Sequence, residues 1–225
     1  MTEDSGPAEG LEQTRAYLRN ADPVLARLID NRPTFDPRAW MAQLPPMDLY
    51  GALLFQVTGQ QLSVLATRRI LARIEALFNG HLPSAAELLE VDPGKLREAG
   101  LSWRKVSTLR DLAERFSDGR LNPDVLSTLP DEEVMAELTA IPGIGPWTVQ
   151  GALLIALQRE DVVLPGDLAL RKAVQAAYRL DHLPSQQEVL SIAEKWRPHR
   201  SLATSYLFSA AFEPTDTPPV APRET

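Results

Sequence analysis

Asp167 is the residue whose type and setting fit catalysis best. It follows Pro165-Gly166 and opens the apolar and basic stretch 168–172. An aspartate there is expected to cap a helix, because its carboxylate accepts from the unpaired amides of the first turn. A cap also holds a carboxylate rigidly at the edge of a site, where it can stabilise a developing positive charge. Capping alone and capping with catalysis both fit, and Asp161, before an apolar run, is a rival acid.

Two glycines two residues apart, Gly143 and Gly145, predict a tight turn upstream of Asp167. Glycine allows positive φ and leaves the amides of the turn uncovered. Pro146 fits the first position of the following helix, where its missing N–H costs nothing. Uncovered amides at the positive end of a helix suit a phosphate group. We therefore predict a helix–hairpin–helix that contacts the nucleic-acid backbone at Gly143, Ile144 and Gly145; the alternative is a plain helical turn without a ligand.

Basic residues near these motifs are candidates for phosphate contacts. They are Arg104, Lys105, Arg110, Arg171, Lys172, Arg197 and Arg200. The formal net charge of the chain is −7, so affinity for DNA has to come from such a local strip. Arg171 and Lys172 fit a solvated helix face equally well.

The elements that would position these residues are helices. Apolar spacing is helical along almost the whole chain, and the expected helices include 49–58, 131–138, 147–158 and 168–178. Ser84 with Glu87 and Ser185 with Glu188 have the spacing of capping boxes. The segment 161–165 is an extended connector rather than a strand. About ten short helices in an all-α fold are expected.

Composition excludes several classes of function. The chain has no cysteine, which excludes a thiol nucleophile, an iron–sulfur cluster and a Cys-ligated zinc site. His81, His182 and His199 are isolated from one another, so no catalytic metal is predicted. No apolar run approaches the roughly 20 residues of a membrane span. The polar segments 1–10 and 213–225 are expected to be disordered tails, and a soluble, cytoplasmic protein is expected, nucleoid-associated if bacterial.

Together, the hairpin and the later aspartate resemble the helix–hairpin–helix DNA glycosylase superfamily, and within it the 3-methyladenine DNA glycosylase II family. Three further segments are similar to that family: the Gln-rich loop 59–63, the stretch 101–105 and the segment 193–201. The resemblance runs from about Asp22 to Phe212 and implies two helical lobes with an active-site cleft between them. These lobes would span 11–48 with 160–212, and 49–159.

The resemblance also implies roles for individual residues. Asp167 would be the catalytic aspartate. Gln60, Gln61 and Leu62 would form the wedge that fills the space left by a flipped base, with Gln61 at the intercalating position; the alternative is that these glutamines cap the following helix. Aromatic residues would form the base pocket, and main-chain carbonyls of the hairpin would bind Na⁺ or K⁺, with no other cofactor. The pocket residues are Trp147, Phe208 and Tyr206, and the carbonyls belong to Thr139, Ile141 and Ile144.

Two departures from the relatives refine this expectation. Larger members carry an N-terminal β-rich domain, whereas only a short helical segment precedes the glycosylase core here. Members with lyase activity carry a lysine directly after the hairpin, where this chain has Trp147. A compact, monomeric, monofunctional enzyme is therefore expected. It would remove bases such as 3-methyladenine or 7-methylguanine from damaged double-stranded DNA without cleaving the strand. The alternatives are a non-catalytic DNA-binding module, or a glycosylase for uracil or for etheno and methylated adducts.

Overall fold

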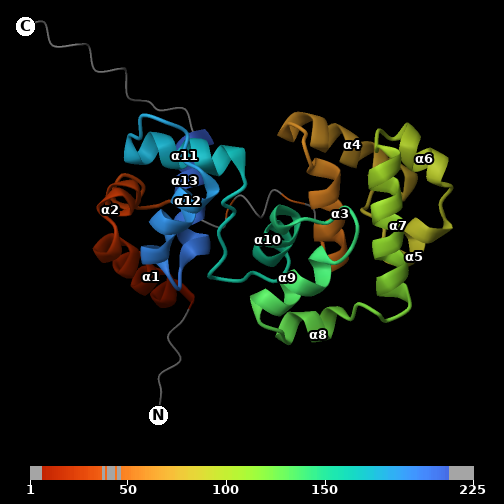
Figure 1. Ribbon diagram of the computed structural model, residues 1–225, viewed down its shortest axis with the longest axis horizontal. Coiled ribbons are helices and arrows are strands. Elements are labelled where there is room, and N and C mark those ends of the chain that lie inside the picture. The colour runs from red at the N-terminus through yellow and green to blue at the C-terminus, as the bar shows by residue number, and fades with distance from the viewer. Residues whose placement is uncertain (1–6, 37–38, 40–43, 45–46, 213–225) are drawn as a thin grey trace, which may run out of the picture. The chain divides into compact units, whose positions relative to one another are not determined.

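Helices make up all the regular secondary structure in the part of the chain that the computed structural model describes, namely residues 7–36, 39, 44 and 47–212 (Figure 1). The all-α prediction is therefore confirmed. Of the two expected tails, residues 1–6 and 213–225 lie outside the described residues. The first helix begins at Pro7, so the expectation of a tail as far as residue 10 is wrong. The chain divides into two compact units, residues 1–37 with 165–225 and residues 38–164.

The first unit packs helices from both ends of the chain. Its helices are α1 (Pro7–Ala21), α2 (Pro23–Asp30), α11 (Leu168–Tyr178), α12 (Gln186–Ala193), the 3-10 helix η2 (Glu194–Trp196) and α13 (Arg200–Phe212). At its centre Asp22 is fully buried. The Asp22 carboxylate accepts from Trp196 Nε1 at 2.8 Å, from Lys195 Nζ at 3.1 Å and from the hydroxyl of Tyr178. One carboxylate thus joins the α1–α2 junction to α11 and η2.

The second unit contains the helices between these two ends. They are α3 (Leu49–Gly59), α4 (Val64–Leu77), α5 (Ala85–Glu90), α6 (Pro93–Glu98), α7 (Trp103–Ser117), α8 (Pro123–Thr128), α9 (Asp131–Thr139) and α10 (Pro146–Ile155). α3 packs against α4, α7 and α10, and α10 also packs against α9. Both α3 and α10 are buried along most of their length, because they are apolar on nearly all faces. The segment 161–165 forms no strand, as expected.

Local signals located the helix starts well. α11 has the predicted bounds, and α10 starts at Pro146 as expected but ends at Ile155 rather than at Gln158. Both capping boxes are present. They share the sequence His-Leu-Pro-Ser-x-x-Glu, and in each the histidine ring lies within hydrogen-bond distance of the glutamate carboxylate. The hydrogen bonds from Ser84 and Ser185 hold the pKa of Glu87 and of Glu188 at about 2. None of the described helices is long and apolar enough to cross a bilayer.

Candidate active site and nucleic-acid interface

The hairpin between α9 and α10 has the geometry that its glycines predict. Gly143 has φ +93°, a conformation that glycine adopts without strain. Ile141 and Ile144 anchor the turn in the core, and the Ile144 amide donates to the Ile141 carbonyl at 3.0 Å. Gly145 is the N-cap of α10 and supplies no capping side chain. The start of α10 is therefore bare main chain, which suits a phosphate group.

Thr108 of α7 supports the hairpin from within the unit. Its hydroxyl donates to the Pro142 carbonyl at 3.0 Å, and its side chain is buried. A Cβ added at Gly143 would lie 2.1 Å from Thr108 Oγ1. The close approach of α7 therefore requires glycine at position 143, independently of the positive φ. Nothing in the chain sequence indicated Thr108 as a residue of this site.

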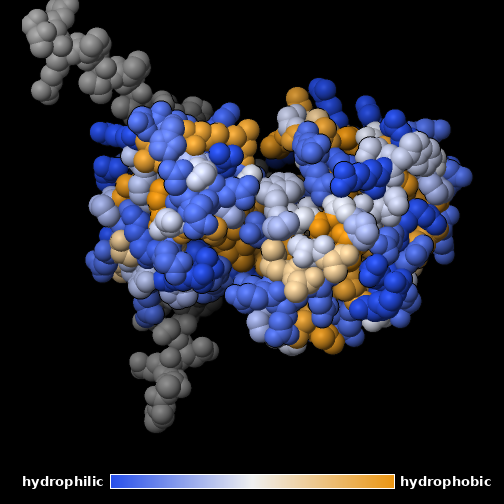
Figure 2. Space-filling model, in the orientation of Figure 1, coloured by the Kyte–Doolittle hydropathy of each residue, from blue (hydrophilic) through white to orange (hydrophobic). Residues whose placement is uncertain are grey.

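The loop between α3 and α4, residues 60–63 of the Gln-rich segment, exposes the side chains at its tip. Gln61 has φ +59° and is exposed, and the side chain of Leu62 is 40% exposed. Two apolar residues that follow, Val64 and Leu65, are 65% and 60% exposed, and Figure 2 shows apolar surface around the start of α4. An exposed apolar tip is the feature that a wedge between base pairs requires.

Gln60 differs from its two neighbours in this loop. Its amide nitrogen donates to the Gly143 carbonyl at 3.0 Å and to Thr148 Oγ1 at 2.9 Å. The structure therefore gives Gln60 a role in binding the hairpin and leaves Gln61 and Leu62 as the wedge candidates. The alternative that the glutamines cap the next helix is wrong, because Ser63 caps α4 by accepting from the Ala66 amide at 3.2 Å.

Lys105 supports the same loop from α7. Its ammonium donates to the carbonyls of Thr58 at 2.8 Å and Gln60 at 2.9 Å. Burial lowers the pKa of Lys105 below its ordinary value. The prediction that Lys105 contacts phosphate is therefore not supported by its position: its charge is directed at the main chain at the end of α3.

Two other basic residues predicted to contact phosphate, Arg171 and Arg110, also bind main-chain carbonyls. Arg171 Nε donates to the Pro184 carbonyl at 2.7 Å, and Arg110 Nη1 donates to the carbonyls that end α5. Arg197 pairs with Glu194 at 2.9 Å, and Arg200 is half-buried at the start of α13. Arg104 and Lys172 are exposed and remain the best candidates for phosphate contacts.

Asp167 lies at the first residue before α11, where its predicted capping role is confirmed. Its Oδ1 accepts from the Leu170 amide at 2.9 Å. The side chain is half-buried, and Leu168 beside it is 52% exposed. The cap fixes the position of the carboxylate at the positive end of α11, as a rigid carboxylate of an active site requires.

The predicted pocket aromatics differ in their exposure. Trp147 is half-buried in the first turn of α10, and Phe208 is half-buried on α13. Tyr206 is 0% exposed, its hydroxyl accepts from Arg15 Nε at 2.9 Å, and its ring packs on Phe35. Its position does not support a base-pocket role, because Tyr206 is part of the core of its own unit.

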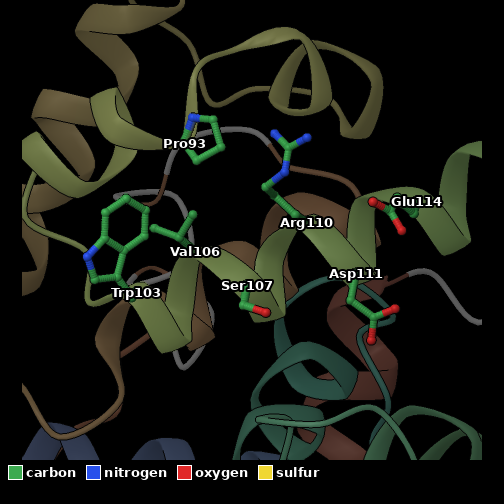
Figure 3. A pocket seen from close by; sticks show the side chains of 7 residues that line it. All are labelled: Pro93, Trp103, Val106, Ser107, Arg110, Asp111 and Glu114. Atoms are coloured by element: carbon green, nitrogen blue, oxygen red, sulfur yellow. The ribbon is translucent and has the colours of Figure 1, made fainter.

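A surface pocket of about 410 Å³ lies along α7. Figure 3 shows Trp103 at one end of it and Asp111 and Glu114 at the other. Arg110, one of the basic residues predicted to contact phosphate, lines this pocket, whereas none of the other residues expected to bind or cleave DNA does. Among the described residues, no three His, Asp or Glu side chains gather closely enough to hold a metal ion.

Comparisons with known proteins agree with these features. Residues 56–199 match the model of the HhH-GPD superfamily base excision DNA repair proteins. DNA-3-methyladenine glycosylase 1 of Schizosaccharomyces pombe is 31% identical over 95% of this chain and 93% of its own length. DNA-3-methyladenine glycosylase of Saccharomyces cerevisiae is 35% identical over 69% of this chain and 56% of its own length.

The fold is also similar to that of a solved structure. The 3-methyladenine DNA glycosylase of S. pombe in complex with abasic DNA superposes with a TM-score of 0.80 and 29% identity, covering 88% of this chain and 96% of that one. The matched segment 56–199 contains the Gln-rich loop, the hairpin and Asp167. The chain therefore belongs to the HhH-GPD superfamily of base excision DNA repair proteins, on the branch that includes the DNA-3-methyladenine glycosylases.

Proposed function

We propose that this protein is a monofunctional DNA glycosylase that releases alkylated bases of the 3-methyladenine and 7-methylguanine type from double-stranded DNA. The observation that carries the proposal is Asp167, a carboxylate fixed by its own helix cap. It lies in a chain that matches an alkylation-repair glycosylase over nearly its whole length.

The carboxylate of Asp167 supplies the chemistry. Cleavage of an N-glycosidic bond leaves a sugar with oxocarbenium character, and a fixed negative charge beside it lowers the barrier. The cap bond from Leu170 holds Oδ1, so the carboxylate would face the sugar, or orient the attacking water, from a fixed position. An alkylated purine that carries a positive charge is already a good leaving group, so no further acid is required.

The wedge loop and the hairpin supply access to the base. A glycosylase has to extrude the nucleotide from the stack, and a side chain has to occupy the space it leaves. Gln61 and Leu62 are the exposed side chains of the loop. The main-chain amides of Gly143 and Gly145 would bind the backbone phosphates, which positions the strand without reading its sequence. The predicted contact at Ile144 is not supported, because its amide already donates to the Ile141 carbonyl.

Trp147 supports a reaction without strand cleavage. Lyase activity in this superfamily needs a lysine amine directly after the hairpin, and an indole cannot form the Schiff base on which that reaction depends. The half-buried indole instead offers an aromatic face for a cationic base.

The hairpin carbonyls fit a monovalent cation. Thr139, Ile141 and Ile144 would each offer a neutral main-chain oxygen, the donor type that Na⁺ and K⁺ prefer. The Ile141 carbonyl accepts one hydrogen bond, from Ile144, and keeps a second lone pair. A cation there would place positive charge beside the bound phosphate. Replacing K⁺ by a tetraalkylammonium ion at constant ionic strength should then weaken binding to duplex DNA.

The test is the release of free bases from duplex DNA treated with dimethyl sulfate. Chromatography identifies the freed bases, and denaturing electrophoresis and borohydride trapping then check the strands for nicks and covalent complexes. Release of methylated purines without either product is the expected result. Binding without release would instead indicate a non-catalytic module. Release from uracil-containing or ethenoadenine-containing duplexes, with none from methylated DNA, would indicate the other class of substrate.

A further inference from the structure

Lys105 and Gln60 tie the wedge loop to two neighbours at once. The Lys105 ammonium donates to two main-chain carbonyls, that of Thr58 in the last turn of α3 and that of Gln60 at the start of the loop. The last carbonyls of a helix lack partners within the helix, so an ammonium there both caps α3 and lies at its negative end. The side-chain amide of Gln60 in turn donates to the Gly143 carbonyl and to the Thr148 hydroxyl. The loop is therefore bound by α7 and by the hairpin.

The hairpin is held by the same helix. Thr108 lies three residues after Lys105 on α7, and its hydroxyl binds the Pro142 carbonyl. Residues three apart on a helix are neighbours on one face. Adjacent side chains of α7 thus hold the loop and the hairpin, and the helix geometry sets the separation between these two motifs.

We propose that Lys105 is a positioning residue for base extrusion, which acts with Gln60 and Thr108 to hold the Gln61-Leu62 tip at a fixed distance from the hairpin. The inference rests on the proposed glycosylase function. The tip side chains can occupy the space left by a flipped base only if the main chain of the loop keeps its position against the stacked DNA. The charged hydrogen bonds from Lys105 fix that main chain, and Lys105 does not have to contact DNA to do so.

The test separates positioning from phosphate binding. Lys105→Met keeps most of the side-chain volume and removes the ammonium. We expect the single-turnover rate constant of base release, at saturating enzyme, to fall about tenfold, the effect of losing a charged hydrogen bond. The affinity for undamaged duplex and its dependence on salt should stay at the wild-type values. Arg104→Met serves as the matched comparison, since exposed Arg104 precedes Lys105 and loss of one phosphate contact changes the log–log salt slope by about 0.9.

Two further variants guard the interpretation. Lys105→Arg keeps the charge and the donors and should restore the rate toward the wild-type value. Gln60→Met removes the bonds to Gly143 and Thr148, and it should slow base release as Lys105→Met is expected to do. It therefore replaces Lys105→Met as the test if that variant does not fold. Circular dichroism and thermal unfolding determine the folded fraction of each protein before its rate is compared.

Base extrusion can also be measured by fluorescence, independently of bond cleavage. The fluorescence of a 2-aminopurine next to the lesion increases when the lesion is flipped and its neighbour unstacks. Asp167→Asn provides a background in which base release is too slow to interfere during the measurement. Lys105→Met should reduce that signal at saturating enzyme. A reduced salt slope with a wild-type rate and signal would overturn the proposal in favour of phosphate contact. A wild-type protein that gives the signal but releases no base would contradict the proposed function and leave the positioning role intact.

Discussion

The side-chain amide of Gln60 reaches the main-chain carbonyl of Gly143 at 3.0 Å, across 83 positions of sequence. This bond joins the loop with the exposed tip to the hairpin that contains Gly143 and Gly145. Two motifs that have separate tasks in a glycosylase, displacing a base and holding the backbone, are thus parts of one rigid assembly. Gln61, the next residue of the same loop, adopts positive φ.

Gly143→Ala should destabilise the protein and weaken its binding to duplex DNA. A Cβ at this position meets Thr108 Oγ1 at 2.1 Å, and φ is +93°. The left-handed conformation alone costs about 1–2 kcal/mol for a residue with a Cβ, and the overlap adds to it. We therefore expect the free energy of unfolding, measured in urea, to fall by ~2 kcal/mol or more.

Gly145→Ala is the matched control for stability. Gly145 has φ −109°, and nothing lies within 4 Å of an added Cβ. The free energy of unfolding should then change by about 1 kcal/mol or less, the usual cost of alanine at an N-cap. If both variants lose the same free energy of unfolding, the contact with Thr108 is not the reason that position 143 requires glycine.

The sequence was sufficient for features that depend on neighbours along the chain. The cap at Asp167, the two capping boxes and Pro146 at the start of α10 follow from a few adjacent residues. Positive charge, in contrast, predicted phosphate contacts for Lys105 and Arg171, whose side chains bind carbonyls of distant segments. A basic residue in a sequence does not reveal its partner.

The same limit applies to aromatic residues. Tyr206 and Phe208 are two positions apart on α13, and residue type gives no reason to separate them. Only the packing of Arg15 and Phe35 shows that Tyr206 belongs to the core. Thr108 was missed for a similar reason, because a threonine within an amphipathic helix is common and the hairpin that it supports lies elsewhere in the sequence.

Asp167→Asn should separate the two roles of this aspartate. Asparagine caps helices about as well as aspartate, so the free energy of unfolding should stay within ~0.5 kcal/mol of the wild-type value. Base release from methylated DNA should fall by about a hundredfold or more, because the fixed negative charge is lost. Asp167→Ala should lose the cap as well, at a cost of about 1 kcal/mol. Near wild-type turnover of the asparagine variant would show that Asp167 is only a cap.

Asp22 should make the protein sensitive to acid. Burial raises the pKa of its carboxyl, but hydrogen bonds from Tyr178, Trp196 and Val24 outweigh burial and leave that pKa below the ordinary 3.8. A pKa that is lower in the folded state contributes stability above the unfolded value and loses it as the pH falls through the folded value. The contribution should therefore be complete at neutral pH, begin to fall near the unfolded value of about pH 4, and be lost only as the pH drops through the lower folded pKa.

Two variants of Asp22 check this assignment. Asp22→Ala leaves the buried donors of Tyr178 and Trp196 without their acceptor, and should cost about 3–5 kcal/mol at pH 7. Asp22→Asn keeps an acceptor but no charge, so its free energy of unfolding should depend less on pH between 5 and 3 than that of the wild type, by the same linkage. Parallel pH profiles for the wild type and Asp22→Asn would contradict the lowered pKa.

Trp147→Ala should change the choice of substrate rather than activity alone. The indole lies half-buried in the first turn of α10, directly after the hairpin. An aromatic face stabilises a cation by roughly 0.5–2 kcal/mol, which corresponds to about a 2- to 30-fold effect on kcat/KM. Loss of the ring should therefore reduce the excision of cationic 7-methylguanine more than that of neutral ethenoadenine, measured on matched duplexes. Trp147→Phe keeps an aromatic face and should preserve the preference for the cation. A uniform loss on both lesions would mean that Trp147 contributes packing alone, and that the selectivity for alkylated bases comes from the weakened bond of the lesion itself.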